Sequence, residues 1–421
     1  MIVNLKLYMF GLFMLLSLLT TALTALLKTN IYFNLYPYVL ALLAGILGSL
    51  TLPQGVYSLR KDMRDIVIVG LCILASTLYQ VLVLDEVLFF VLYSMRFYFG
   101  GVFLIIFYLQ FFRSCDIAPE VIKKWILGFV EIAIVFNFFM AAAEIFFGAS
   151  FWIPASRFRE GIDELSRSFG FTGNSAVLGG FSVFLTLYYF SQNQGSLRMR
   201  NWFILLLGLI TLGLSQSGTG YYCFALAILA IFYNGIRHKL LLIPIIFAFI
   251  AFSFVILLGQ EQLDEGGRLT VRALIGLIQL HGLNVCLFAQ QAIDGSLFNL
   301  VLGSFNFMKY TTFTEKLWFI EGNSSIYDFA YIAMLLEVGL VGFAAYLWFY
   351  IRAASRAFGK EAFLSKFSIY ILLFGSLHYG VSFWICSQVM SGLLLTAHMD
   401  MNAKGRARAR PGIKARKEYM A

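Results

Sequence analysis

Apolar runs of about 20 residues recur along almost the whole chain, and this feature constrains the fold more than any other. Of the 421 residues, 60% are hydrophobic and 13% are charged, which leaves too little polar surface to cover a water-soluble globule. Backbone groups in hydrocarbon must be hydrogen bonded within one segment or within a closed barrel, and these runs lack the period-two alternation of barrel strands. The sequence therefore predicts an all-α polytopic membrane protein.

Hydropathy predicts about twelve transmembrane helices, most of them joined by short loops. The boundaries near 215–220 and 378–384 are the least sharply defined, because the loops there are very short. The predicted spans are 7–27, 33–52, 66–85, 87–112, 123–147, 175–192, 201–216, 219–235, 240–258, 326–351, 367–383 and 384–398.

Basic residues in the short loops predict which side of the membrane each loop faces. Most of them fall on the side where the N-terminus starts, and the positive-inside rule identifies that side as the cytoplasm. The basic segment 399–421 falls there too, so both termini are expected in the cytoplasm. This bias accounts for the formal net charge of +9, and no nucleic-acid partner is expected.

Two segments on the opposite side, 148–174 and 259–325, are too long to be simple turns, and loops of this length usually carry function. The apolar stretches 273–283 and 297–308 are too short to span, and we expect them to lie at the outer interface or to pack over the helices. The predicted organisation is a single transmembrane domain over 1–398 with an extracytoplasmic cap, followed by a basic cytoplasmic tail at 399–421.

The two outer loops carry arginines that the positive-inside rule does not explain. A guanidinium binds phosphate oxygens bidentately and keeps its charge, so an outer cluster suits a phosphorylated, membrane-anchored ligand. Salt bridges to the acidic residues of the same loops are the alternative, and composition does not choose between the two. The cluster consists of Arg157, Arg159, Arg167, Arg268 and Arg272.

A further arginine, Arg96, falls inside a predicted transmembrane helix, where a charge is costly unless it faces a polar cavity or a partner. Counted at ~1.5 Å per residue from the cytoplasmic ends, Arg96 lies ~24 Å up its helix, and Glu131 and Glu144 lie ~12 Å and ~30 Å up the next. Neither carboxylate matches Arg96 well in depth, although the long side chain could bridge to Glu144. Arg96 is therefore either an anion contact or part of a structural ion pair. Glu337, in a later span, is either structural or catalytic.

Motifs for soluble cosubstrates are absent from the sequence, which has no Walker lysine loop, dinucleotide glycine fingerprint, HExxH or GxSxG. The five cysteines stand singly and far apart, so neither a disulfide framework nor a zinc site is expected. We therefore expect no metal and no other cofactor.

Four stretches between residues 150 and 350 resemble a known family in their order and spacing. They are RSFGFTGNSAVLGGFSVFL (167–185), LGLSQSGTGYYCFALAIL (212–229), GGRLTVR (266–272) and GNSSIYDFAYIAMLLEVGLVG (322–342). The chain resembles the bacterial O-antigen polymerase and O-antigen ligase superfamily of polysaccharide-assembly proteins. The resemblance implies a helical bundle in the inner membrane, with an outer loop that covers a periplasmic active site.

The resemblance also implies metal-independent glycosyl transfer from an undecaprenyl-diphosphate-linked oligosaccharide. Arginines would hold the diphosphate while an acceptor hydroxyl attacks the anomeric carbon, and a chain-length regulator is a further candidate partner. The diphosphate-binding residues implied are Arg96, Arg157, Arg159, Arg167, Arg268 and Arg272. The acceptor-activating group is expected among five unranked residues, namely Asp264, Glu265, His281, Glu321 and Asp328.

Gly170, Gly173 and Asn174 are expected to shape a tight loop and to expose backbone donors at the entrance of the next helix, and a simple glycine turn with a helix cap is the alternative.

Two departures from the family favour a polymerase over a ligase. Ligases typically show His-Asn where this chain has Gly322 and Asn323, and often an arginine where it has a glycine after the SQS break. A transporter or flippase of lipid-linked sugars is a third interpretation, against which the asymmetric outer loop and the lack of internal repeats count.

Overall fold

The elements of this protein that can be described are all helical. Each element is either an α-helix or a short 3-10 helix, and no strand occurs in the described ranges. The computed structural model describes residues 2–26, 35–49, 60–115, 117–148, 168–194, 198–235, 297–304, 330–359, 362–377 and 380–408.

The helices follow the predicted spans closely. Every predicted span except 240–258, which lies outside the described residues, overlaps a helix. The span 7–27 contains two helices, and the α-helix within 367–383 ends at Gly375. The elements before residue 194 are α1 (Ile2–Leu18), α2 (Thr20–Leu26), α3 (Tyr36–Ser49), α4 (Arg60–Leu82), α5 (Leu88–Ser114), α6 (Pro119–Phe147), η5 (Gly170–Thr172) and α7 (Ser175–Asn193). Those that follow are α8 (Met199–Ser215), α9 (Gly218–Gly235), α12 (Leu297–Leu302), α14 (Ala330–Phe358), α15 (Phe363–Gly375), η8 (Val381–Phe383) and α16 (Ile385–Arg408).

Among the residues that the structure describes, four helical segments are long and apolar enough to cross a membrane, namely Arg64–Leu82, Met95–Ser114, Pro119–Phe147 and Met334–Phe358. Large apolar side chains such as Leu71 of α4 and Phe139 of α6 are exposed on these segments, as expected of surfaces that face lipid. The chain is therefore a helical membrane protein, and the count of about twelve crossings stays a prediction.

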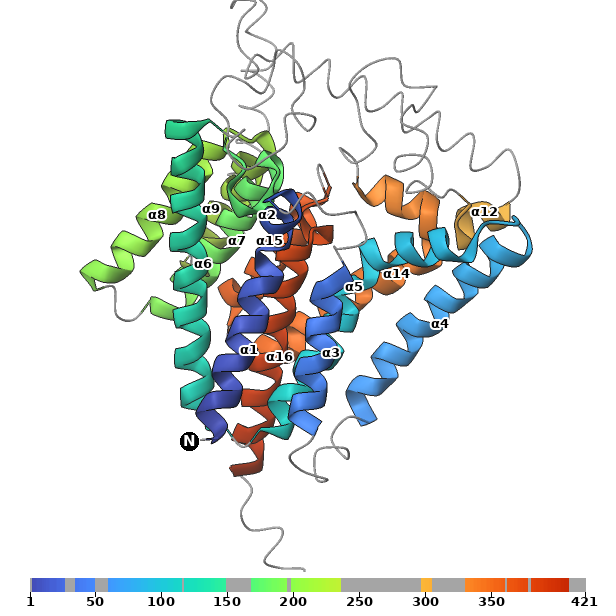
Figure 1. Cartoon of the computed structure of the whole chain (residues 1–421), viewed down its shortest axis with the longest axis horizontal. Helices are drawn as coiled ribbons and strands as arrows, with labels where there is room; N and C mark the ends of the chain where they lie inside the picture. The colour runs from blue at the N-terminus through green and yellow to red at the C-terminus, as the bar shows by residue number, and fades with distance from the viewer. Residues whose placement is uncertain are drawn as a thin grey trace, which may run out of the picture. The chain divides into compact units, whose positions relative to one another are not determined.

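Two compact units make up the chain. Unit 1 comprises Met1–Cys72, Met95–Ala227 and Ala344–Ala421, and unit 2 comprises Ile73–Ser94 and Ile228–Phe343. In unit 1, α1 packs beside α3 and α16, while α6 packs beside α7, α8 and α16 (Figure 1). The predicted division into a domain over 1–398 and a tail stays a prediction.

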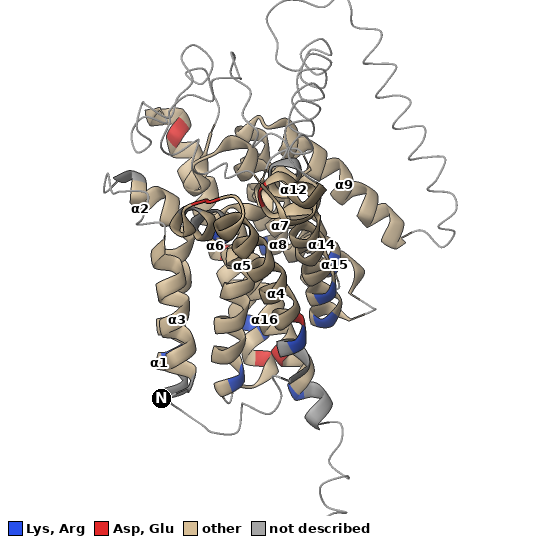
Figure 2. Cartoon of the chain, turned by 90° about the vertical axis from the view of Figure 1, so that its right-hand side faces the viewer, with Lys and Arg blue, Asp and Glu red and all other residues tan. Residues whose placement is uncertain are grey.

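Helix ends that border the loops predicted to be cytoplasmic contact one another at one end of unit 1. Asp65, near the start of α4, forms ion pairs with Arg352 and Arg356 near the end of α14. Lys404 of α16 donates to three backbone carbonyls at the end of α5, between Phe112 and Ile117. Figure 2 shows basic segments near the end of unit 1 at which the chain begins. Which side of the membrane this end faces stays a prediction.

Helix α16 extends further than the sequence predicted. Its predicted span ends at residue 398, whereas the helix continues to Arg408, into the segment that was assigned to the tail. Asp400 and Lys404 form an ion pair of 2.8 Å one turn apart, and Lys404 also caps the C-terminal end of α5. These polar contacts support helix beyond the apolar run, which a hydropathy window cannot detect.

Glycines allow two helices of unit 1 to approach at backbone distance. A Cβ added to Gly179 of α7 would lie 2.8 Å from the Cα of Gly220 of α9, and one added to Gly180 would lie 3.0 Å from Val381 of η8. Gly179 and Gly180 of VLGG and Gly220 of SQSGTG therefore have a packing role.

Candidate functional site

Most of the predicted site residues lie outside the described residues, and their arrangement stays a prediction. Those described are Arg96, Gly170, Gly173 and Asn174, all in unit 1. The ones outside are Arg157, Arg159, Arg167, Asp264, Glu265, Arg268, Arg272, His281, Glu321 and Asp328.

Residues 168–174 form a tight turn that leads into α7. Gly170 and Gly173 have φ values of 52° and 72°, in the left-handed region that glycine adopts most easily. Asn174 caps the helix, because its side-chain oxygen accepts hydrogen bonds from the nitrogens of Ala176 at 2.9 Å and Val177 at 3.2 Å. The polar sequence before this apolar helix therefore forms a glycine turn and an N-cap.

A buried carboxylate from α6 fastens the turn. Glu144, only 4% exposed, accepts hydrogen bonds at Oε2 from the backbone nitrogens of Phe169 at 2.6 Å and Gly170 at 3.0 Å. The Ser168 nitrogen donates to the carbonyl of Leu214 at 3.0 Å. A carboxylate that accepts two backbone N–H groups supplies the negative charge that such a turn favours.

The backbone donors of this turn are thus largely used within the protein. The expectation that the loop exposes backbone donors to a ligand is not met at Phe169, Gly170, Ala176 and Val177, whose N–H groups all have internal acceptors. Sequence reasoning considered Glu144 only in relation to Arg96. The available signal was an acidic residue at the end of a span that precedes a glycine-rich turn.

Glu131, the other carboxylate of α6, is engaged at a different level of the helix. It forms an ion pair with Arg200 of α8 and accepts a hydrogen bond of 2.8 Å from the Tyr189 hydroxyl of α7. These contacts tie α6 to α7 and α8.

Arg96 lies in α5 against an aromatic ring from α3. Its Cζ atom is 5.9 Å from the centre of the Tyr38 ring. The Tyr38 hydroxyl donates to Oε1 of Gln388 at 3.0 Å, and Nε2 of Gln388 donates to the carbonyls of Phe97 at 2.8 Å and Phe383 at 3.0 Å. Three helices, α3, α5 and α16, therefore converge on this polar cluster.

The level of Arg96 in the helix is informative. At ~1.5 Å per residue, Arg96 lies ~27 Å along α5 from Ser114. Ser114 is the residue that lies near the carbonyls bound by Lys404. Arg352, Arg356 and Lys404 mark the basic end of unit 1. Arg96 lies in the half of this membrane-length helix that is further from that end. A guanidinium in such a position is a candidate contact for an anionic group.

Hydrogen bonds in the turn between α15 and α16 hold the start of the helix that carries Gln388. Ser376 and Ser382 lie 2.6 Å apart through their hydroxyl oxygens, and the Ser382 nitrogen donates to Oγ of Ser376 at 2.9 Å. The Tyr346 hydroxyl of α14 donates to Oγ of Ser382 at 2.8 Å. These buried bonds satisfy the irregular backbone just before α16 begins and so fix the start of the helix that carries Gln388.

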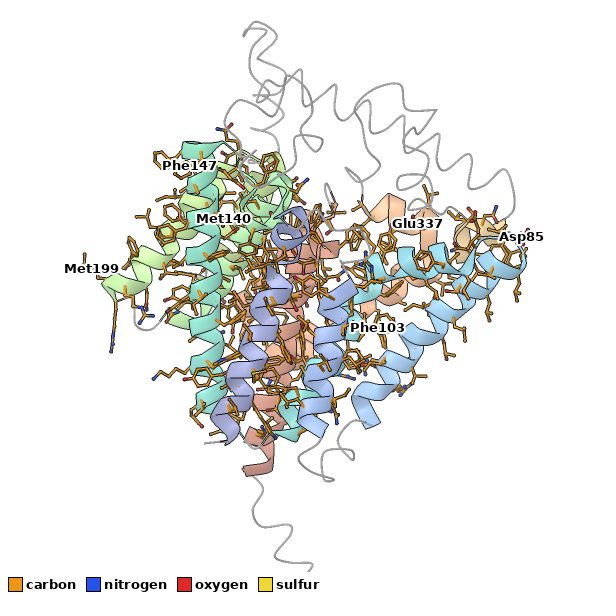
Figure 3. All side chains as sticks on the ribbon, viewed as in Figure 1. Asp85, Phe103, Met140, Phe147, Met199 and Glu337 are labelled. Carbon is orange, nitrogen blue, oxygen red and sulfur yellow. The ribbon has the colours of Figure 1, made fainter. Side chains whose placement is uncertain are left out.

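Unit 2 contains a break in α14 within an apolar segment. Gly339 has φ 72° and ψ 175°, and Glu337, two residues before it, is 2% exposed. Figure 3 labels Glu337 on α14. The Glu337 carbonyl accepts a hydrogen bond of 2.5 Å from Nε2 of Gln80 of α4. Irregular backbone beside a buried carboxylate often marks a functional position in membrane proteins, so Glu337 stays a candidate for either role predicted from the sequence.

Helix α12 packs on this break. The Ser304 nitrogen donates to the carbonyl of Leu336 at 2.9 Å, and the Tyr79 hydroxyl donates to Oδ1 of Asn299 at 2.6 Å. The apolar stretch 297–308 was expected at the outer interface or packed over the helices, and its helical part ends at Leu302. Within unit 2, backbone and side-chain hydrogen bonds hold that part against α4 and α14.

No family model, curated protein or solved structure matches this chain. The resemblance to the O-antigen polymerase and ligase superfamily therefore depends on the sequence stretches alone. Of these, 266–272 lies outside the described residues, and the described parts of the others form the turn, the glycine contacts and the α14 break.

Proposed function

We propose that this protein is a membrane glycosyltransferase that polymerises O-antigen or a related surface glycan. It joins undecaprenyl-diphosphate-linked oligosaccharide repeat units, without a metal, at the periplasmic face of the bacterial inner membrane. The observation that carries the proposal is the guanidinium of Arg96, placed over Tyr38 in a membrane-length helix and far from the basic end of unit 1. A cation at that level suits the phosphate groups of a lipid-anchored substrate.

In the proposed reaction, the acceptor hydroxyl oxygen forms a bond to the anomeric carbon of the donor sugar. The bond between that carbon and the diphosphate oxygen breaks, and the electron pair leaves with the lipid diphosphate. The hydroxyl proton passes to a base, for which Asp264, Glu265, His281, Glu321 and Asp328 stay the candidates. Fixed arginines stabilise the charge on the leaving group more in the transition state than in the ground state.

Arg96 would share the diphosphate with the arginines of the two outer loops. Loss of one donor to a developing anion typically lowers kcat by about 100- to 1000-fold. We therefore expect Arg96→Ala to lower the rate of chain growth by about this factor and to leave single repeat units, and Arg96→Lys to be less severe. Arg167→Ala and Arg268→Ala should likewise abolish long polymer.

The test uses purified full-length protein in detergent, supplied with undecaprenyl-diphosphate-linked repeat units, with products separated by length. Arg198→Ala, an exposed arginine at the start of α8, is the matched control and should retain chain growth. Native rates in Arg96→Ala would remove Arg96 from the site. Full-length polymer from both Arg167→Ala and Arg268→Ala would refute the loop assignment.

The same assay separates the alternatives. Transfer of the glycan to lipid A core, without chain growth, would identify a ligase. Movement of lipid-linked sugar across a vesicle membrane, with no new glycosidic bond, would identify a transporter or flippase. Chain growth without a membrane gradient requires catalysis and is the result that the proposal expects.

A further inference from the structure

We infer that Tyr38 and Gln388 are positioning residues, which together form a brace that holds the Arg96 guanidinium in one place for a diphosphate group. The inference rests on the proposed function in one respect, since it takes the anion to be the lipid diphosphate of the donor. The brace itself consists of contacts among α3, α5 and α16 of unit 1.

The brace occupies the space beside α5 that a side chain at Gly100 would fill. Arg96 and Gly100 are four residues apart in α5 and so lie on the same face of the helix. A Cβ added to Gly100 would lie 2.1 Å from the Tyr38 hydroxyl oxygen and 2.7 Å from Oε1 of Gln388. The hydroxyl of Tyr38 thus reaches across the missing side chain, with its ring under Arg96.

The hydrogen bonds of Gln388 determine that the Tyr38 hydroxyl is a donor rather than an acceptor. Nε2 of Gln388 donates to two backbone carbonyls, those of Phe97 and Phe383, so Oε1 can only accept. The Tyr38 hydroxyl must therefore be the donor, and the ring is fixed at its far end by an amide that is 1% exposed. Because Phe97 follows Arg96 in the chain, the brace is hydrogen bonded to the backbone next to Arg96.

A fixed Tyr38 ring restricts the positions that the Arg96 guanidinium can take before a ligand binds. An arginine side chain loses rotamer entropy when it is held in one position. The attraction between the guanidinium and the Tyr38 ring offsets part of that cost before a ligand arrives. The resulting preorganisation matters, because a misplacement of about 1 Å can slow a reaction by about 100-fold.

Helix geometry also favours the side of the membrane that the proposal needs. Side chains in a helix lean toward its N-terminus, which for α5 is the end away from the carbonyls that Lys404 binds. The long side chain of Arg96 is therefore expected to extend away from the basic end of unit 1.

Two matched pairs of variants test the brace. Tyr38→Phe keeps the ring and removes the hydroxyl donor, whereas Tyr36→Phe removes a hydroxyl on the same helix that donates to the Leu16 carbonyl. Gly100→Ala displaces both ends of the brace, whereas Gly128→Ala adds a methyl group that meets no atom within 4 Å. Each variant is first compared with its partner in thermal stability.

The first measurement does not depend on activity. Phenylglyoxal modifies arginines, and mass spectrometry reports the rate at Arg96 in the full-length protein, with and without inorganic pyrophosphate. We expect pyrophosphate to protect Arg96, with an apparent Kd that rises by about tenfold in Tyr38→Phe and Gly100→Ala and stays native in the controls, as expected for loss of preorganisation worth about 1.4 kcal/mol. Undecaprenyl diphosphate in the same assay tests whether the lipid-linked form is the preferred source of the phosphate groups.

The second measurement is chain growth by the same four variants. We expect Tyr38→Phe to lower kcat/KM by about tenfold while its stability matches that of Tyr36→Phe. Equal protection of Arg96 by pyrophosphate in a brace variant and its control would overturn the inference, even if the enzyme elongates normally. Brace-dependent protection in a protein that builds no polymer would instead refute the proposed function and keep the brace. If pyrophosphate and undecaprenyl diphosphate both leave native Arg96 unprotected, the inference is wrong.

Discussion

Replacing Glu144 tests whether one carboxylate holds the turn before α7. Both hydrogen bonds from the turn end on the same atom, Oε2 of Glu144, with the nitrogens of Phe169 and Gly170 as donors. Glu144→Leu removes the acceptor, whereas Glu144→Gln keeps an oxygen in a similar position. The pair of variants therefore separates the loss of hydrogen bonds from the loss of charge.

The expected costs follow from these two bonds. A buried N–H left without an acceptor costs about 1–3 kcal/mol, so Glu144→Leu should destabilise the turn by about 2–6 kcal/mol. In Glu144→Gln, one amide oxygen can accept both bonds, and the weaker neutral bonds are partly offset because a charge is no longer buried, which leaves a cost of about 0–2 kcal/mol.

Two assays report the effect. Titration with a denaturing detergent in mixed micelles gives the change in unfolding free energy, and the thiol reactivity of Thr172→Cys reports local opening, because residue 172 is fully buried. If Glu144→Leu lowers the cost of opening by 2 kcal/mol or more, reactivity at this position should rise by about 30-fold. Stabilities of both variants within about 0.5 kcal/mol of the native protein would show that Glu144 does not hold the turn.

Two further predictions concern the α14 break and the end of α16. Gly339→Ala should cost at least about 3 kcal/mol of unfolding free energy, because the backbone conformation is nearly exclusive to glycine and a Cβ would lie 2.5 Å from the Gly303 nitrogen. Gly235→Ala in the same unit meets no atom within 4 Å, and equal losses in the two variants would argue against the break. Burial raises the pKa of the Asp400 carboxyl, and Lys404 acts in the opposite direction. A raised carboxyl pKa means that native stability falls as pH rises above about 4, where the carboxyl of the unfolded chain loses its proton. The stability of Asp400→Asn relative to the native protein should therefore increase as pH rises above about 4 in thermal unfolding, and a constant difference would contradict this.

Particular residues show how much the sequence could predict. In the described residues, the helices overlap the spans that hydropathy predicted, because burial of about 20 apolar residues in lipid is a local property of each segment. The glycines of the turn and the capping role of Asn174 are also local, since a left-handed φ and an N-cap depend on neighbours within a few residues. By contrast, the Glu144 carboxylate accepts hydrogen bonds from backbone N–H groups 25 and 26 residues further on, which periodicity cannot reveal.

The candidate site divides in the same way. The sequence by itself determined that the chain is an α-helical membrane protein, and it singled out Arg96 as a charge that an apolar helix must accommodate. Only the tertiary structure brought Tyr38 and Gln388 to that arginine, because the hydrogen bond between them joins residues 350 positions apart. Local patterns specify which segments enter the membrane, whereas the partners of a buried polar group depend on how separate helices pack, and in hydrocarbon every such group must find a partner among them.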